Sequence, residues 1–338
     1  MKAVVYYNYG SPGVLRCEEI AKPTPGDDEV LIEVRAASVN PLDWHFMRGT
    51  PYFIRLMLGL RKPKLPRLGV DVAGLVEAAG RNVTQFKPGD RVFGSCRGAF
   101  AEYVCTSQAA LAVKPDNVTF EQAASVPMAA LTALQAFRDK GHIQPGQKVL
   151  INGAAGGVGT FAVQIARSFG AEVTGVCSTR NVDMVRSLGA DRVIDYTQGD
   201  FTGNGQQYDV ILDLIANHSL SACRRILNPK GTYIAAGGTA GRWMIGALAR
   251  SIGALVLSWF VGQRLVGFLT KGSKEDLAIM GQLMQAGKVT PVIDRRYTLS
   301  EVAEAVRYLE DGHARGKVVI TLTPPGSATA SSSAGPSA

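Results

Sequence analysis

The sequence has few cysteines, and their spacing excludes the common cysteine motifs. The five cysteines are Cys17, Cys96, Cys105, Cys177 and Cys223, and no two of them are separated by two to four residues. This spacing excludes a zinc knuckle and a Cys-x-x-Cys redox motif. The odd count and the wide spacing indicate reduced thiols, so the sequence predicts a cytoplasmic protein.

Long apolar runs are also missing. The most apolar stretch, Trp243–Leu269, contains Arg250 and Arg264, and only thirteen residues lie between these arginines. Because a membrane span needs about 20 apolar residues, we expect no transmembrane segment. We interpret the stretch as buried or subunit-facing, with contact to a membrane surface as the open alternative. The strand-like pattern starts at Met1 and indicates no signal or transit peptide.

A strong charge of one sign is absent as well. The formal net charge is +8 over 338 residues, and no run of five basic residues occurs. Residues Arg55–Arg67 hold five basic side chains, which we interpret as part of a solvated loop, with an anionic surface as the alternative partner. Because no nucleic-acid-binding motif accompanies the charge, we do not expect nucleic-acid binding.

The chain has two sequence patterns. Residues 1–120 contain short β-like runs, such as Val30–Val34 and Val72–Ala78, separated by turn residues. From Phe120 to Lys140 the pattern is helical, and after it strand-like and helical runs alternate, which predicts parallel βαβ units and a doubly wound sheet. Two helices and a strand at Lys317–Leu322 follow. Residues 323–338 are dominated by small residues and proline, and we predict a disordered tail.

A glycine-rich turn gives the most specific chemical signal. The apolar strand Lys148–Asn152 runs into this turn, which opens the predicted helix Gly157–Phe169. Backbone amides at such a helix start bind a pyrophosphate, and glycines allow the close approach that a Cβ would block. The sequence therefore predicts a dinucleotide site that includes Ala155, Gly156, Gly157, Val158 and Gly159.

The end of the second predicted strand indicates which dinucleotide binds. In NAD sites an Asp or Glu at this point holds the ribose 2′-hydroxyl, whereas this chain has Ser178 and Arg180 and no carboxylate. A hydroxyl and a guanidinium suit a 2′-phosphate, since arginine offers several donors in a fixed fork. We therefore expect NADPH. The alternative is that Arg180 is only a solvated charge on a loop.

These blocks carry a family resemblance. The segment Gly146–Arg167, with its Ala154-Ala155-Gly156-Gly157-Val158-Gly159 run, resembles the quinone oxidoreductase and zeta-crystallin branch of the medium-chain dehydrogenase/reductase superfamily. Gly69–Gly74, Lys87–Val92 and Gly312–Val319 resemble further blocks of that family. The resemblance implies an α/β protein in which a Rossmann doubly wound parallel sheet is inserted in a GroES-like, mostly antiparallel β domain. It also implies a homodimer or tetramer, and we expect a homodimer.

On this basis we divide the chain into four parts. Residues 1–120 form the first part of the GroES-like catalytic domain, 121–265 the NADPH-binding domain, 266–322 the return to the catalytic domain, and 323–338 the tail. In the zinc alcohol dehydrogenases that the chain also resembles, two metal ligands occupy the positions of Asn40 and Val70. Neither side chain is a usual zinc ligand, so we predict no metal.

Three residues are candidates for the reaction itself. Asn40 is a candidate for contact with the substrate or the nicotinamide ribose, with structural capping of the local turn as an equal alternative. His45 and Tyr52 are candidate proton donors, with a satisfied histidine and simple packing as the alternatives. We expect Asp43 and Asp71 to anchor loops through buried hydrogen bonds rather than to take part in the chemistry.

The family resemblance assigns further residues to the cofactor. It places Thr132 and Phe268 at the nicotinamide end, Tyr196 near the 2′-phosphate, Gly237 and Gly238 over the ribose, and Lys317 near the phosphates or the nicotinamide ribose. The function implied is a zinc-independent, NADPH-dependent reduction of a quinone or an α,β-unsaturated carbonyl compound. The alternatives are a zinc-type alcohol dehydrogenase and an NADPH-binding protein with a non-enzymatic, crystallin-like or RNA-binding role.

Overall fold

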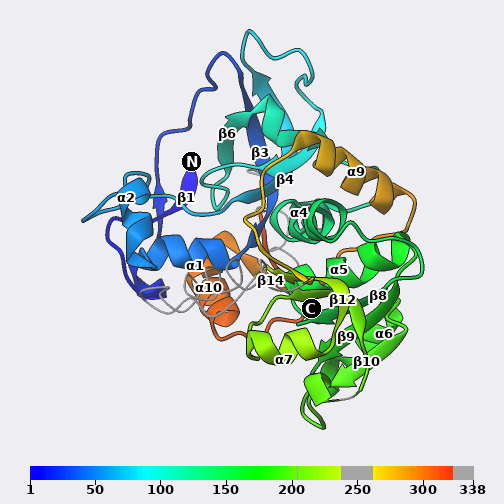
Figure 1. Ribbon diagram of the computed structural model, residues 1–338. Helices are drawn as coiled ribbons and strands as arrows, with labels where there is room; N and C mark the ends of the chain where they lie inside the picture. The colour runs from blue at the N-terminus through cyan, green and yellow to red at the C-terminus, as the bar shows by residue number, and fades with distance from the viewer. Residues whose placement is uncertain (204, 237–261, 323–338) are drawn as a thin grey trace, which may run out of the picture.

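Two β-sheets from different parts of the chain organise the molecule (Figure 1). The computed structural model describes residues 1–203, 205–236 and 262–322. The predicted tail at 323–338, the ribose residues Gly237 and Gly238, and most of the Trp243–Leu269 stretch lie outside the described residues. Among the residues that are described, no helix is long and apolar enough to cross a membrane.

The first sheet has six parallel strands in the order β10-β9-β8-β11-β12-β13. The strands are β8 (Lys148–Asn152), β9 (Glu172–Cys177), β10 (Arg192–Asp195), β11 (Tyr208–Asp213), β12 (Leu227–Ala235) and β13 (Arg264–Gly267). The strand order reverses between β8 and β11, and doubly wound sheets bind their ligands at the carboxyl ends of the strands beside such a reversal. The predicted doubly wound parallel sheet is confirmed.

Helices cover this sheet because its strands are apolar on both faces. Val149, Leu150 and Ile151 of β8 are fully buried, as expected for a strand that packs between two layers. The connecting helices are α5 (Gly157–Ser168), α6 (Val182–Ser187) and α7 (Leu220–Arg225), with short 3₁₀ turns at Thr179–Asn181 and Phe201–Gly203.

The second sheet joins the two ends of the chain. Its order is β14-β15-β3-β4-β5-β7, with β6 paired to β3. The strands are β3 (Glu29–Val39), β4 (Asp71–Ala79), β5 (Arg91–Ser95), β6 (Tyr103–Ser107), β7 (Leu111–Val113), β14 (Ile293–Thr298) and β15 (Lys317–Thr321). Strand β15 pairs with β3 in antiparallel register, so the parallel domain is inserted between two parts of one mostly antiparallel domain.

The helix expected over Phe120–Lys140 is three elements rather than one. It consists of α3 (Phe120–Ala124), α4 (Pro127–Gln135) and a π-helical turn at Ala136–Gly141. Pro127 accounts for the first break, because it has no N–H with which to continue the helical hydrogen bonds, although the Val126 backbone before it stays helical.

The C-terminal part supplies α9 (Lys274–Gln285) and α10 (Val302–Glu310), which is preceded by a 3₁₀ turn. A capping box formed by Thr298 and Glu301 starts this turn. The spacing of three residues lets each side chain reach the other's backbone. The expected domain boundary at residue 265 falls inside β13.

Smaller elements complete the catalytic domain. They are β1 (Lys2–Val5), β2 (Arg16–Glu19), α1 (Pro41–Arg48), α2 (Arg55–Leu58), and 3₁₀ turns at Pro12–Val14, Tyr52–Ile54, Gln108–Ala110 and Leu299–Glu301. Helix α1 directly follows β3, so its first residues lie at the end of a central strand of the second sheet. Helix α2 stands at the edge of this domain that points away from the parallel sheet (Figure 1).

Candidate functional site

The glycine-rich turn lies between β8 and α5, at the reversal of the parallel sheet. Gly153 has a φ of 92°, which glycine adopts without the strain of an L side chain. A Cβ on Gly159 would lie 2.1 Å from the Gly153 carbonyl oxygen, so only glycine fits there. Gly156 precedes α5 and provides no side-chain cap. The first amides of α5 therefore remain available for an anion, and the helix dipole favours a pyrophosphate at this position.

A polar corner lies at the carboxyl end of β9. The Arg180 guanidinium donates a hydrogen bond to the carbonyl of His313 at 3.1 Å, and the Arg315 guanidinium donates to the carbonyl of Arg180 at 3.4 Å. The Ser178 hydroxyl accepts from the side-chain amide of Asn181 at 3.1 Å. The loop before β15 thus contributes a second arginine, which the sequence analysis did not identify because it is more than a hundred residues away from Arg180.

Tyr196 lies at the same edge of the sheet. Tyr196 directly follows β10, and its backbone N–H donates to the carbonyl of Cys177 at 3.0 Å. It therefore lies beside the chain segment that leads into Ser178. The side chain is 56% exposed. The Nε of Arg315 is buried and has no hydrogen-bond partner among the described residues, so a donor remains for an anionic ligand. Two arginines, a hydroxyl and a phenol at this edge of the sheet offer donors that suit an anionic group.

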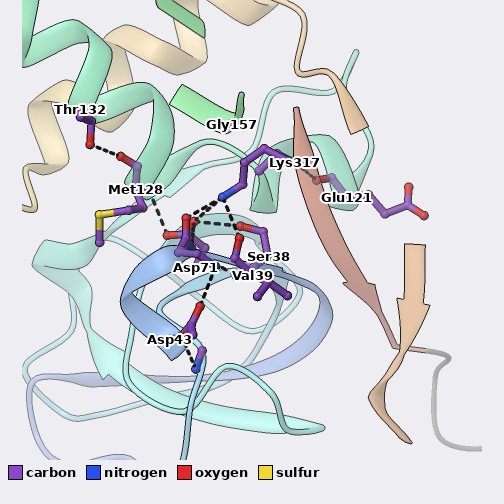
Figure 2. A network of polar contacts seen from close by, with 12 residues as sticks. Ser38, Val39, Asp43, Asp71, Glu121, Met128, Thr132, Gly157 and Lys317 are labelled. Atoms are coloured by element: carbon purple, nitrogen blue, oxygen red, sulfur yellow. Dashed lines mark hydrogen bonds and ion pairs between the residues drawn. The ribbon is translucent and has the colours of Figure 1, made fainter. Parts of the chain in front are cut away.

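Lys317 connects the glycine turn with the catalytic sheet. The backbone N–H of Gly316 donates to the carbonyl of Ala155 at 2.9 Å. A Cβ on Gly157 would contact the Lys317 side chain at 3.3 Å. From this position the lysine extends into the interior, where it is only 3% exposed (Figure 2). One side chain therefore spans from the proposed pyrophosphate turn to the end of β3.

The Asp71 carboxylate is the centre of a buried polar network, called here the Asp71 network (Ser38, Asn40, Asp71, Met128 and Lys317). One carboxylate oxygen accepts from the Ser38 hydroxyl and the Asn40 amide, each at 2.9 Å, and the other accepts from the Met128 backbone N–H at 3.0 Å (Figure 2). The Lys317 ammonium lies 3.7 Å from Asp71 and donates to the Asn40 amide oxygen at 2.6 Å. Both polar groups of the Asn40 side chain are thereby engaged within the protein.

Burial dominates the protonation of the charged side chains in and beside this network. It raises the pKa of Asp71 and lowers the pKa of Lys317, while attraction between the two opposes both shifts. Burial also raises the pKa of Asp43 to about 7, although its oxygens accept the backbone N–H groups of Asn40 and Gly69 at 2.8 and 3.0 Å. The buried hydrogen bonds expected of Asp43 and Asp71 are present, and the absence of a role in the chemistry stays a prediction.

Thr132 lies on α4, one turn beyond the Met128 amide that Asp71 holds. Its hydroxyl donates to the Met128 carbonyl at 2.7 Å and contacts the hydroxyl of Thr270 at 2.6 Å (Figure 2). Phe268 follows β13 and packs partly buried against the main core. The structure thus places the proposed nicotinamide residues Thr132 and Phe268 on two segments that meet through Thr270.

His45 and Tyr52 lie toward the other end of α1. The Nδ1 atom of His45 is 2.9 Å from the Thr50 carbonyl, and its ring stacks on Trp44 with centroids 3.7 Å apart. Burial lowers the pKa of His45, so the neutral ring donates this hydrogen bond. Tyr52 helps to line a pocket of about 380 Å³ together with Trp44 and Arg55.

Candidate metal ligands do not gather in the described parts of the chain. No group of three or more His, Cys, Asp or Glu side chains within residues 1–203, 205–236 and 262–322 is arranged to hold a metal ion. The two positions at which the resemblance placed zinc ligands hold Asn40, whose amide is engaged in the Asp71 network, and Val70. Of the predicted cofactor residues, Gly237 and Gly238 lie outside the described residues.

Together, the reversed parallel sheet, its glycine turn and the flanking antiparallel domain define a two-domain, dinucleotide-binding oxidoreductase. Residues 26–116 match the family model of the alcohol dehydrogenase GroES-like domain, and residues 188–320 match that of the zinc-binding dehydrogenase. The chain belongs to the quinone oxidoreductase-like family of the medium-chain dehydrogenase/reductases, a family of NAD(P)H-dependent oxidoreductases.

Similar proteins cover nearly the whole chain. A chloroplastic quinone oxidoreductase of Triphysaria versicolor is 36% identical, with 95% of this chain and 98% of that protein covered. A mitochondrial NAD(P)H oxidoreductase of Bos taurus is 35% identical (95% and 89%), and a 2-methylene-furan-3-one reductase of Solanum lycopersicum is 34% identical (96% and 80%). The solved quinone oxidoreductase of Coxiella burnetii superimposes with a TM-score of 0.84 at 31% identity, covering 96% of this chain and 99% of that one.

Proposed function

We propose that this protein is a zinc-independent, NADPH-dependent reductase of quinones or α,β-unsaturated carbonyl compounds. The observation that carries the proposal is the engagement of Asn40. At the position where zinc alcohol dehydrogenases have a ligand, this amide accepts from Lys317 and donates to Asp71. An amide with both polar groups engaged by buried charged partners is a poor zinc ligand, since zinc sites use thiolate, imidazole or carboxylate.

The arginine corner supports the choice of NADPH. Arg180 and Arg315 lie at the end of β9, where NAD sites carry an acidic residue. The guanidinium groups, with Ser178 and Tyr196 beside them, would form charge-assisted hydrogen bonds with a 2′-phosphate. With a 2′-hydroxyl they would form only weaker hydrogen bonds, because it carries no negative charge. The first amides of α5 would hold the pyrophosphate, and Thr132 would orient the nicotinamide end.

The absence of usual zinc ligands at these two positions favours conjugated acceptors. The reduced nicotinamide supplies a hydride when it is bound. A quinone or enone spreads the developing negative charge over its conjugated system, whereas oxidation of a simple alcohol benefits from a Lewis acid that stabilises the alkoxide. The enzyme's part is then to provide hydrogen-bond donors for the enolate or phenolate oxygen and a proton. Tyr52 and the protonated form of His45 remain the proposed proton donors. Asn40, whose amide is engaged by Asp71 and Lys317, remains proposed only for contact with the substrate or the nicotinamide ribose.

The similar proteins agree with this substrate class. The names of the Triphysaria and Coxiella proteins state a quinone, and that of the Solanum protein states a methylene-furanone, which is a conjugated enone. The two acceptors share an electron-poor carbon conjugated to a carbonyl. A cytoplasmic location and a homodimer stay predictions, and two of the relatives named above are chloroplastic and mitochondrial.

Oxidation of NADPH by the purified protein, measured against a panel of acceptors, tests the proposal. We expect turnover with quinones and enones and little or none with the matched saturated ketones and aldehydes. Oxidation of primary alcohols with NADP⁺ as the faster reaction would instead support the alcohol dehydrogenase alternative. Tight NADPH binding without turnover of any acceptor would support the non-enzymatic alternative.

A further inference from the structure

Residues 53–65, called here the tip segment, expose an unusual number of large apolar side chains. Leu56 is 72% exposed, Met57 80%, Leu60 67% and Phe53 55%. The segment includes α2, which stands at the outer edge of the catalytic domain (Figure 1). Single exposed apolar residues are ordinary on protein surfaces, but a cluster of them on one protruding segment marks an interaction site.

The tip segment is held in a defined shape, so its exposure is not that of a loose chain. The Tyr9 hydroxyl donates to the Gly59 carbonyl at 2.6 Å, and the Lys64 backbone N–H donates to the Leu58 carbonyl at 2.7 Å. The Arg55 guanidinium lies over the rings of Tyr9 and Tyr52, at 4.4 and 4.9 Å from their centroids. These contacts fix the base of the segment and leave its apolar side chains pointing outward.

The charge of the tip segment has one sign. No Asp or Glu occurs between Asp43 and Asp71, whereas Arg61, Lys62 and Lys64 are exposed beside the apolar side chains. A surface that combines aliphatic side chains with lysine and arginine matches the border between lipid headgroups and acyl chains. The aliphatic groups enter the acyl region while the cations face the headgroup phosphates.

We propose that the tip segment docks the protein on the surface of a bilayer that contains anionic lipids. Leu56, Met57 and Leu60 insert among the acyl chains, and the three exposed cations contact the headgroup phosphates. A nucleic acid fits less well, because leucine and methionine offer no ring on which a base can stack. The proposal concerns attachment only and does not depend on the reaction that the protein catalyses.

Flotation of the full-length protein with lipid vesicles tests the proposal. We expect binding to phosphatidylcholine vesicles that contain phosphatidylglycerol, little binding to pure phosphatidylcholine vesicles, and release at high salt. The R61Q/K62Q/K64Q variant is expected to lose about a hundredfold in vesicle affinity. The L56Q/M57Q variant is expected to lose binding by a similar or smaller factor, because apolar insertion adds to the electrostatic attraction.

The matched control for charge is K87Q/K230Q/K288Q, which removes the same number of exposed positive charges elsewhere on the surface. The matched control for hydrophobicity is V113Q, at a residue that is 65% exposed on β7. Thermal unfolding midpoints equal to that of the wild type show that all variants fold. Equal loss of binding in K87Q/K230Q/K288Q and R61Q/K62Q/K64Q would overturn the proposal, since net charge alone would then explain attachment. Absence of vesicle binding would overturn the proposal. Self-association that L56Q/M57Q abolishes would overturn it in favour of a protein-facing surface.

Discussion

The glycine turn and the Asp71 network meet at Lys317, yet they are stabilised in different ways. The turn depends on the absence of a side chain at Gly159, because a Cβ there would collide with the Gly153 carbonyl. The Asp71 network depends on what is present, because each buried polar group is paired with a side chain or backbone group from a distant part of the sequence. The turn is therefore sensitive to added volume and the network to removed partners.

Loss of one partner in the Asp71 network should have the largest effect. The K317M variant leaves the buried Asp71 carboxyl group without its cationic partner. We expect this variant to lower the free energy of unfolding by about 3–5 kcal/mol. The D71N variant should cost a similar amount, because its new N–H₂ group faces the donors of Asn40 and Lys317. Denaturant-induced unfolding measures both.

The double variant D71N/K317M separates pairing from simple loss of contacts. Without the lysine, the Asn40 amide is able to turn over and accept a hydrogen bond from the new amide at position 71. We expect the double variant to be at least about 2 kcal/mol more stable than the sum of the single effects predicts. Additive effects would show that Asp71 and Lys317 contribute independently to the free energy of unfolding, which would contradict the network.

Added volume in the turn should have the next largest effect, and it should depend on the position. The G159A variant places a Cβ against the Gly153 backbone at 2.1 Å, so we expect it to lose about 3 kcal/mol of stability. In G157A the new Cβ meets only the flexible stem of Lys317, at 3.3 Å. We expect that variant to fold normally and to bind NADPH more weakly, as measured by titration calorimetry. Equal stability of both variants would contradict the turn geometry.

Removal of the Arg180 guanidinium should change the preference for NADPH over NADH by a smaller free energy. We expect R180Q to reduce the ratio of kcat/KM for NADPH to that for NADH by about 10- to 100-fold, because charge-assisted hydrogen bonds contribute roughly 1.5–3 kcal/mol. The control is R186Q, which removes an exposed arginine from α6 in the same βαβ unit. If both variants change the ratio equally, general electrostatic attraction and not a local contact explains the preference.

His45 should give the smallest effect, seen in the pH dependence of stability. Burial lowers its pKa from the ordinary value of 6.5, so the unfolded chain binds more protons than the folded one below that pH. The histidine's contribution is complete above pH 6.5 and is lost as the pH falls through the lowered pKa. We expect the acid-side loss of unfolding free energy to be smaller in H45Q than in the wild type.

The same variant tests the proposed proton donor. If His45 only holds the Thr50 carbonyl, H45Q should leave kcat for a quinone within about threefold of the wild type, whereas loss of a general acid typically costs a hundredfold or more. A large loss of kcat with an altered pH profile would assign the proton transfer to His45. The Y52F variant tests in the same way whether the Tyr52 hydroxyl donates the proton.

The turn was predictable from the sequence, and the Asp71 network was not. Apolar strand, small residues and helix follow one another within Lys148–Ser168, so local rules were sufficient to predict the parallel sheet and the glycine site. The network joins Ser38, Asp71 and Lys317, which are far apart in the sequence. The antiparallel pairing of β3 with β4 brings Ser38 to Asp71, and the pairing of β15 with β3 adds Lys317; no periodic pattern in the sequence reports either pairing.

The remaining differences have similar causes. Pro127 was present in the sequence as a signal for a helix break, but the apolar pattern on both sides of it suggested one continuous helix. Arg315 was missed because its relation to Arg180 depends on a loop from the other domain. The basic residues of Arg55–Arg67 were recognised in the sequence, but the exposure of Leu56 and Met57 beside them depends on the fold.

We propose that a buried amide network, and not zinc, occupies the position that holds a metal ligand in zinc alcohol dehydrogenases. The most direct test is the metal content and quinone turnover with NADPH of one preparation, before and after treatment with EDTA. We expect less than stoichiometric zinc and a rate that EDTA leaves unchanged. Stoichiometric zinc, with a rate that falls on chelation and returns on addition of zinc alone, would contradict it.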